Sequence, residues 1–97
     1  MIGIIAHLKV KDGQQEALEA VFRELAPAVR ANEPGCLLYT LTRKQGSTTE
    51  YVVMEQYKSQ ADVDAHGKSA HFTTFAPRMG PCLDGRPDIV RLDGIDL

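Results

Sequence analysis

The apolar positions of the chain change their period several times, and each change marks a new element. Apolar and polar side chains alternate over residues 2–10, which predicts a β-strand. Over residues 14–32 the apolar positions recur every three or four residues, which predicts an amphipathic helix. Residues 36–44 and 49–58 are apolar-rich segments that predict two strands, and the Gln-Gly-Ser-Thr stretch between them predicts a hairpin.

Two short helices are expected next. Ser59, followed by Asp62 three positions later, has the pattern of a capping box and predicts a helix start. We expect Gly67 to end this helix in the left-handed conformation, since glycine adopts it without steric cost. Ser69 then caps a second helix, and residues 86–94 predict a final short strand.

The order strand, helix, strand, strand, helix pair, strand predicts an α+β ferredoxin-like sandwich with βαββαβ connectivity. The 97 residues, 43% of them hydrophobic and 25% charged, fit a single domain spanning 1–97. A domain this small is marginally stable alone, because it buries only about 60–65% of its unfolded surface. Association between copies is therefore a reasonable expectation.

The second strand carries bulky apolar residues on both faces. Alternation assigns Leu38 to one face and Leu37, Tyr39 and Leu41 to the other. Helices on one side of a sheet cover only one of its faces, so the other face needs a partner. A second copy would close a dimeric α+β barrel, and we expect Leu41, assigned to the uncovered face, to break the dimer when it is replaced by aspartate.

Composition narrows the partners and the location. Eleven basic and thirteen acidic residues give a net charge of −2 without a basic stripe, so we expect no nucleic-acid partner. No apolar run is long enough to cross a membrane, so no membrane partner is expected. Cys36 and Cys82 are too few for a disulfide scaffold and favour reduced thiols in the cytoplasm.

Two of the three histidines, His66 and His71, lie five positions apart, too far for neighbours on one helix face. The junction between Gly67 and Ser69 makes this spacing useful, because it would place one imidazole at the end of a helix and the other at the start of the next. We therefore expect the two histidines to flank one pocket. The alternative is that both are structural and bind backbone carbonyls.

Glu55 is a carboxylate within an apolar strand, where it is costly unless paired or solvated. It could orient an imidazole or accept a proton. Alternatively, it lies at the sheet edge or pairs with an arginine such as Arg43 or Arg91. No metal-binding spacing, phosphate loop or dinucleotide motif is present, so neither metal nor organic cofactor is expected.

The chain resembles the antibiotic biosynthesis monooxygenase family, and within it the branch of small quinol monooxygenases. The resemblance extends over nearly the whole chain, from the first strand and helix to the last strand. Its most specific part is an ordered set of residues in the third strand and the helix pair: Glu55, Tyr57, Ala65, His66, Ser69, His71 and Phe72.

The resemblance implies a homodimer with a pocket between sheet and helices in each subunit. It also implies oxidation of a quinol or polycyclic phenol by O2 without flavin, haem or metal. In that chemistry His66 would be the general base or a hydrogen-bond donor, His71 would orient the substrate or stabilise an oxyanion, and Glu55 would support them. Five residues would form the pocket walls: Leu25, Tyr51, Phe72, Phe75 and Met79.

The family pattern leaves the reaction class open. Tyr57 stands where many relatives have tryptophan, and the residues at the haem-degrading positions, Ala6, His66 and Ala76, disfavour haem degradation. The family also contains an isomerase of a phosphorylated ketose with the same pair of histidines. A dimeric protein that binds a small aromatic ligand without turnover is a further alternative.

Overall fold

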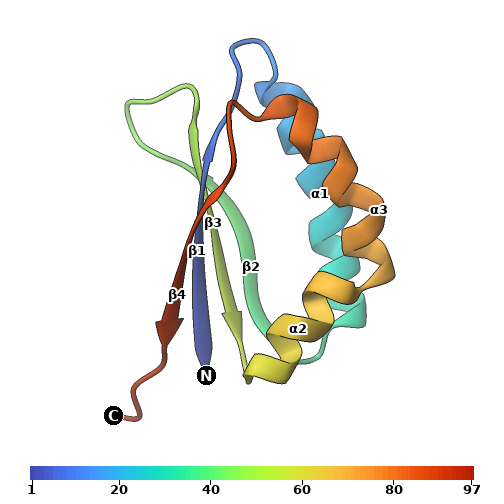
Figure 1. Ribbon diagram of the computed structural model, residues 1–97, viewed down its shortest axis with the longest axis vertical. Helices are drawn as coiled ribbons and strands as arrows, with labels where there is room; N and C mark the ends of the chain where they lie inside the picture. The colour runs from blue at the N-terminus through green and yellow to red at the C-terminus, as the bar shows by residue number, and fades with distance from the viewer.

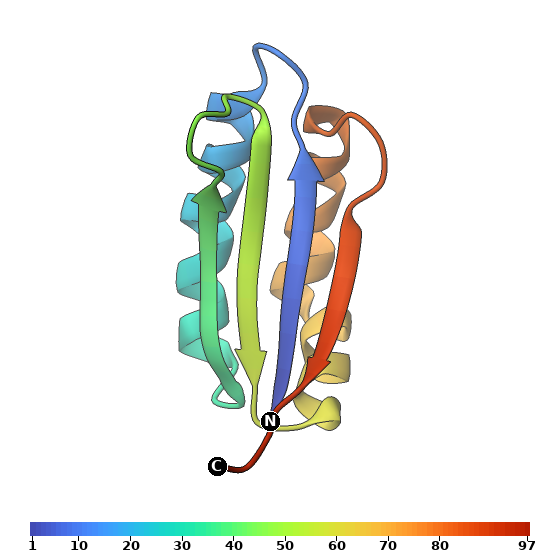
Figure 2. The ribbon, with the colours of Figure 1, turned by 90° about the vertical axis from the view of Figure 1, so that its left-hand side faces the viewer.

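The computed structural model describes all 97 residues and forms a four-stranded antiparallel sheet with helices on one side (Figure 1). The strands are β1 (Ile2–Lys9), β2 (Cys36–Arg43), β3 (Glu50–Tyr57) and β4 (Asp88–Asp93). Their order across the sheet is β2-β3-β1-β4, as Figure 2 shows. With helices between β1 and β2 and between β3 and β4, this is the ferredoxin-like α+β fold that the sequence predicted.

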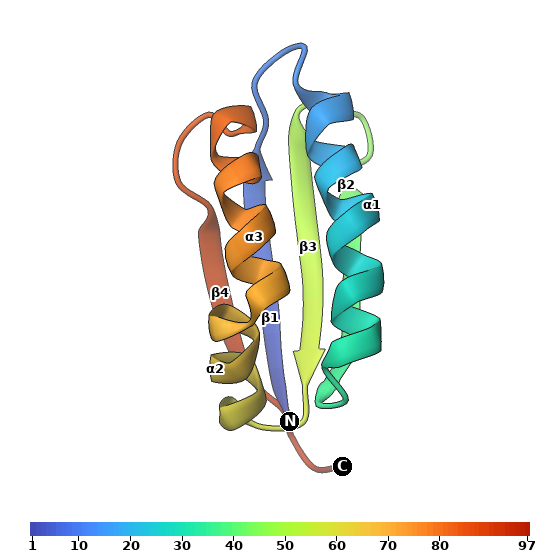
Figure 3. The ribbon, with the colours of Figure 1, turned by 90° about the vertical axis from the view of Figure 1, so that its right-hand side faces the viewer.

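Three helices pack on the same face of the sheet (Figure 3). Helix α1 (Gln15–Asn32) covers β2 and β3, whereas α2 (Gln60–Lys68) and α3 (Ala70–Met79) follow each other over β1 and β4. The buried side chains of α1 form the apolar stripe that its period predicted: Leu18, Val21, Phe22, Leu25 and Val29. None of these helices is both long and apolar enough to cross a membrane.

The strand register decides which side chains face the helices. Ile4 on β1 is buried, and it lies opposite Glu55 on one neighbouring strand and Arg91 on the other. Residues directly opposite each other share a face of the sheet. Glu55 and Arg91 therefore face the helices, on either side of Ile4.

One assignment made from alternation is wrong. A register shift between Cys36 and Leu38 interrupts β2, so Leu37 does not share a face with Tyr39 and is half exposed. Tyr39 is buried, and Leu41 packs against the same helix-side core. Leu41 therefore does not lie on the uncovered face. Alternation grouped it correctly with Tyr39 and opposite Leu38, but the helices cover the Tyr39 face and not the Leu38 face.

The junction between α2 and α3 follows the expected caps but not the expected glycine. The Ser59 and Ser69 side chains accept hydrogen bonds from the Asp62 and Phe72 amides, as helix caps do. Helix α2, however, runs through Gly67 to Lys68, and Gly67 does not have a positive φ. The serine cap of α3, and not a left-handed glycine, turns the chain.

Candidate active site

A cavity of about 690 Å³ lies between the sheet and the α2–α3 pair. Eleven of its eighteen lining residues are hydrophobic, and they come from both layers. Ile4, Ala6 and Val53 contribute from the sheet, and Phe72 and Met79 from α3. A mostly apolar cavity with a few polar groups is typical of a site for a small organic ligand.

His66 is the buried polar residue at this cavity. Its ring packs among three aromatic rings, with centroid distances of 5.2 Å to Tyr39, 5.6 Å to Tyr57 and 4.8 Å to Phe72. These contacts hold the imidazole in one orientation. The cavity therefore contains a histidine whose ring is fixed by packing.

The Glu33 carboxylate contacts Nδ1 of His66 at 2.9 and 3.0 Å. An ionised carboxylate only accepts hydrogen bonds, so a neutral His66 carries its proton on Nδ1 and leaves the lone pair of Nε2 free. Nε2 has no hydrogen-bond partner in the chain. Every fully buried side-chain nitrogen of the chain has a hydrogen-bond partner, so Nε2 is not fully buried. It follows that Nε2 is open to the cavity and can accept a proton.

His71 lies on the other side of Glu33. Its Nε2 makes a short hydrogen bond to Oε2 of Glu33, and its ring centroid is 6.4 Å from that of His66. His71 lines a separate pocket of about 150 Å³, beside Asn32 and Asp62. The prediction that the histidines come together is confirmed, but the prediction that both flank one pocket is wrong. Neither imidazole is held by a backbone carbonyl.

Glu55 lines the same cavity as His66 but does not hydrogen bond to it. Its carboxylate accepts a hydrogen bond of 2.6 Å from the Tyr57 hydroxyl, and it lines the large cavity. Burial raises the pKa of the Glu55 carboxyl, although the Tyr57 hydroxyl and His66 act in the opposite direction. The strand β3 is internal, and Glu55 belongs to none of the ion pairs, so neither alternative placement is correct.

Of the five wall residues that the resemblance implied, two line the cavity and three do not. Phe72 and Met79 line the cavity. Leu25 is fully buried in the core, and Phe75 packs against that core with the Arg78 guanidinium over its ring. Tyr51 donates a hydrogen bond of 2.7 Å to Glu19 and lines a shallow pocket near the β2–β3 hairpin.

Glu33 is the residue that sequence reasoning missed. It is the C-terminal cap of α1 and is followed by proline and glycine, a pattern that by itself indicates only the end of a helix. The turn packs along α2, because Gly35 lies against Asp62 in the first turn of that helix, where a β-carbon on residue 35 would clash with the carboxylate. A glycine between a helix and a strand was the one available signal for this close approach.

The three side chains Glu33, His66 and His71 also have the ligand types of a metal site. One ligand atom from each lies within 4.8 Å of the others. Two histidines and one carboxylate are a common set for divalent transition metals. The same atoms already hydrogen bond to one another, so the cluster can work as a proton-holding array as it stands.

Comparison with known families gives one match, which extends over most of the chain. The family model described as antibiotic biosynthesis monooxygenase matches residues 1–78. The match includes β1 to β3, both histidines and Glu33. It ends within α3, before β4.

Individual relatives agree with the family match. A Bacillus subtilis protein named "Putative monooxygenase YcnE" is 31% identical over 96% of this chain and 97% of its own length. A crystal structure from Caulobacter crescentus, described as that of "a putative antibiotic biosynthesis monooxygenase", is 41% identical, with a TM-score of 0.94 over 98% of this chain and 90% of that one. The structure of Rv0793 from Mycobacterium tuberculosis is 25% identical, with a TM-score of 0.89 over 99% and 96% of the two chains.

Proposed function

Because the chain belongs to the antibiotic biosynthesis monooxygenase family, we propose that it oxidises a quinol or polycyclic phenol with O2 and without a bound cofactor. One observation carries this proposal. The Glu33 carboxylate holds Nδ1 of His66, while Nε2 is open on a mostly apolar cavity of about 690 Å³. The cavity thus offers a base beside space for an aromatic ring system.

Deprotonation is the step that the protein accelerates. Nε2 of His66 removes the phenolic proton, and the resulting phenolate is electron-rich enough to reduce O2. When a ring CH2 of the keto tautomer becomes C=O, one oxygen atom enters the substrate and the other leaves as water. The substrate then supplies all four electrons, so that no external reductant is required.

Glu33 and the apolar walls have supporting roles in this mechanism. The carboxylate stabilises the imidazolium that forms when His66 takes the proton, as a carboxylate does in other histidine-based sites. The side chains of Phe72 and Met79 exclude water from the reacting ring. Burial raises the pKa of the Glu55 carboxyl and so favours its protonated form, which can donate a hydrogen bond to a developing oxyanion.

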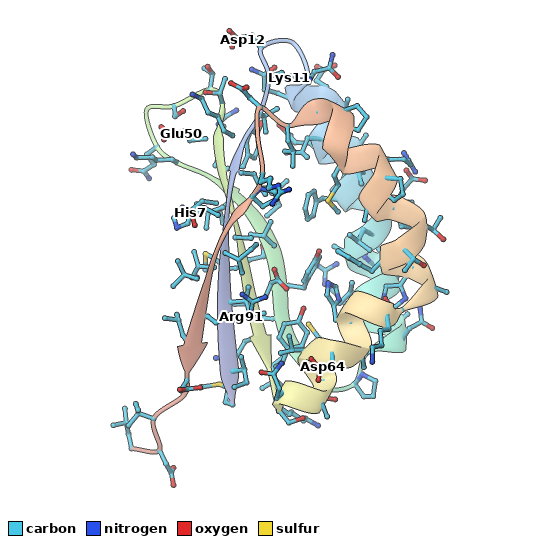
Figure 4. The ribbon with its side chains drawn as sticks, viewed as in Figure 1. His7, Lys11, Asp12, Glu50, Asp64 and Arg91 are labelled. Atoms are coloured by element: carbon cyan, nitrogen blue, oxygen red, sulfur yellow. The ribbon has the colours of Figure 1, made fainter.

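The decisive experiment measures O2 consumption with a panel of quinols and polycyclic phenols. His66→Ala should lower turnover by roughly 10²- to 10⁴-fold, with little change in thermal melting. His7→Ala is the matched control, since His7 lies on the opposite face of the sheet from the cavity (Figure 4). Unchanged turnover in His66→Ala, or no O2 consumption with any substrate, would refute the proposal.

A chelator separates this mechanism from one that uses a metal at Glu33, His66 and His71. If the cluster acts as a proton array, dialysis against EDTA leaves turnover unchanged, and added divalent metal does not raise it. If turnover disappears with EDTA and returns with one metal ion per chain, the cluster is a metal centre.

We also propose that the protein works as a homodimer in the cytoplasm. The dimer is supported by the exposed apolar residues on the face of the sheet away from the helices, among them Met54, Val90 and Leu92. The location is supported by the two cysteines, which are both free thiols.

A further inference from the structure

Arg91 is a cation at the cavity that has no counter-ion in the chain. It lies on β4 and lines the cavity. Figure 4 shows Arg91 on the helix side of the sheet and His7 on the opposite side. None of the six ion pairs of the chain includes it, nor does any side-chain hydrogen bond. Its guanidinium is therefore available to a ligand.

The other charged groups at the cavity are Glu55, Asp64 and Lys68. Asp64 accepts a hydrogen bond of 3.0 Å from Gln60, whereas Lys68 forms no ion pair and follows Asp64 by one helical turn on α2. The Glu55 carboxylate is engaged by the Tyr57 hydroxyl. Of the two cavity-lining cations, Arg91 is the one on the sheet, and it has no acidic neighbour one helical turn away as Lys68 has.

The position of Arg91 suits one end of an elongated ligand. Arg91 and Glu55 lie on the two strands that flank β1, each directly opposite Ile4. Adjacent strands are about 4.8 Å apart, which places the two backbones about 10 Å from each other. A fused aromatic ring system lying over Ile4 can present one substituent to Arg91 and another to the Glu55 and His66 end.

A guanidinium at the mouth of an apolar cavity selects for a particular substituent. Its planar set of donors matches the two oxygens of a carboxylate, and a charge-assisted bidentate pair is stronger than a neutral hydrogen bond. A neutral hydroxyl or carbonyl gains much less from this group. The cavity should therefore prefer an acidic aromatic ligand over a neutral one of the same shape.

We propose that Arg91 binds an oxyanion substituent, a carboxylate in the first instance, on the aromatic substrate of the large cavity. This inference rests on the proposed function only in taking the cavity as the place where an aromatic substrate binds. It makes Arg91 a specificity-determining residue and defines the substrate class as acidic phenols.

The test measures binding, and not turnover, with stable probes. We would titrate the protein with 6-hydroxy-2-naphthoate, whose two substituents lie at opposite ends of the ring system, and with 2-naphthol and 2-naphthyl phosphate, by isothermal calorimetry. The wild type should bind the naphthoate at least about tenfold more tightly than the naphthol. Arg91→Gln should lose about that factor for the naphthoate and change the naphthol affinity less than twofold.

Two further variants keep the result specific. Arg86→Gln removes a cation just before β4 that does not line the cavity, and it should leave all affinities unchanged. Arg91→Lys keeps the charge but not the bidentate geometry, and it should restore part of the preference. If the wild type also binds the naphthyl phosphate more tightly than the naphthol, and Arg91→Gln loses this difference, Arg91 recognises oxyanions in general and not only carboxylates.

The inference is overturned if the wild type binds naphthoate and naphthol equally, or if Arg86→Gln reproduces the effect of Arg91→Gln. Its failure is distinguishable from failure of the proposed function. O2 consumption without a preference for acidic phenols would refute only the role of Arg91. Arg91-dependent binding of naphthoate without O2 consumption by any phenol would refute only the oxygenase reaction.

Discussion

At the scale of single residues, the site depends on a carboxylate that fixes the tautomer of a histidine. His66 presents an unprotonated Nε2 to the cavity only while its Nδ1–H group donates a hydrogen bond to the Glu33 carboxylate. Histidine chemistry in proteins is commonly set by the bond that the second ring nitrogen makes. The base and its orienting group are therefore one functional unit.

The first prediction changes the orienting group and leaves the base in place. In Glu33→Gln the amide NH2 can donate to Nδ1, which moves the ring proton to Nε2 and converts the base into a donor. We expect kcat to fall roughly 10- to 100-fold, by analogy with the loss of other groups that orient a histidine, and KM to stay unchanged. Steady-state kinetics of O2 consumption measure both quantities.

The control is Glu16→Gln, the same substitution in the exposed first turn of α1. It should leave kcat, KM and the melting temperature as they are. Since Glu33 is also a helix cap, thermal melts of Glu33→Gln must accompany the kinetics. A fall in kcat that only follows a loss of folded protein would mean that Glu33 is structural.

The second prediction concerns the pH dependence of stability at Glu55. Burial raises the pKa of this carboxyl in the folded protein, so the folded state favours its protonated form. The stabilisation is complete below the ordinary carboxyl pKa and is lost as pH rises through the raised value. Glu55→Gln is neutral at every pH and should not show this loss.

Urea unfolding of wild type and Glu55→Gln between about pH 4 and pH 8 measures the effect. The variant should gain free energy of unfolding relative to the wild type as pH rises, because other carboxyls titrate equally in both proteins and cancel in the difference. A difference that is constant across this range would contradict the shift. The amide oxygen of the variant can still accept the hydrogen bond from the Tyr57 hydroxyl, so this contact does not change the trend.

The sequence predicted that the two histidines come together, but it did not predict that Glu33 lies between them. A serine cap between His66 and His71 signals a junction, and a junction can bring a five-residue spacing together. Glu33 lies 33 and 38 positions from the two histidines. Its approach depends on how the end of α1 packs against two later helices, which no local pattern encodes.

At the scale of elements, periodicity and caps predicted the helices and strands well, because both are local. The serine caps of α2 and α3 are present as expected. The failures arose where tertiary contact overrides local pattern. The bulge in β2 moves Leu37 out of alternation, and helix α2 continues through Gly67 because α3 has its own cap.

The third prediction compares two glycines next to helix α2. An alanine at position 35 would place its β-carbon 2.0 Å from Oδ1 of Asp62 and force that carboxylate off the Ser59 hydroxyl. We expect Gly35→Ala to lower the free energy of unfolding by about 1–2 kcal/mol, the usual effect of losing a helix cap. It should also reduce turnover, because the same turn carries Glu33.

Gly67→Ala should have the opposite effect on stability. Gly67 is inside α2, and a β-carbon added there would have no other atom within 4 Å. Alanine stabilises a helix interior by about 0.5–1 kcal/mol over glycine. Chemical denaturation of both variants checks the pair. A stable Gly35→Ala would mean that Asp62 moves aside without cost, and a destabilised Gly67→Ala would contradict the helical assignment of that residue.

At the scale of the whole molecule, the sheet has one covered and one uncovered face, as Figure 2 shows from the uncovered side. The strand register aligns a mostly apolar row across it: Thr40, Met54, Ile5 and Val90. Alternating sequence predicted an apolar second face. It did not predict which residues of β2 belong to it, because alternation groups residues by face without saying which face the helices cover.

The last prediction tests the proposed dimer on this row. Met54 is 36% exposed and lies on an internal strand, so Met54→Asp places a charge near the middle of the apolar face. Burying an unpaired carboxylate between two sheets is costly, whereas exposing it on a monomer is not. Sedimentation velocity at micromolar concentration should therefore show a dimer for the wild type and a monomer for Met54→Asp, with the folded secondary structure retained.

Two other aspartate variants decide whether the effect belongs to this face. Ala20→Asp puts the same charge on the exposed side of α1 and should remain a dimer. Leu41→Asp puts the charge against the helix-side core. This variant should therefore have a lower melting temperature, and its folded fraction should still be a dimer. A wild type that sediments as a stable monomer, or a Met54→Asp variant that stays dimeric, would show that the uncovered sheet face is not the interface. The site would then have to work within a single chain, in which one sheet and its own helices already line the large cavity.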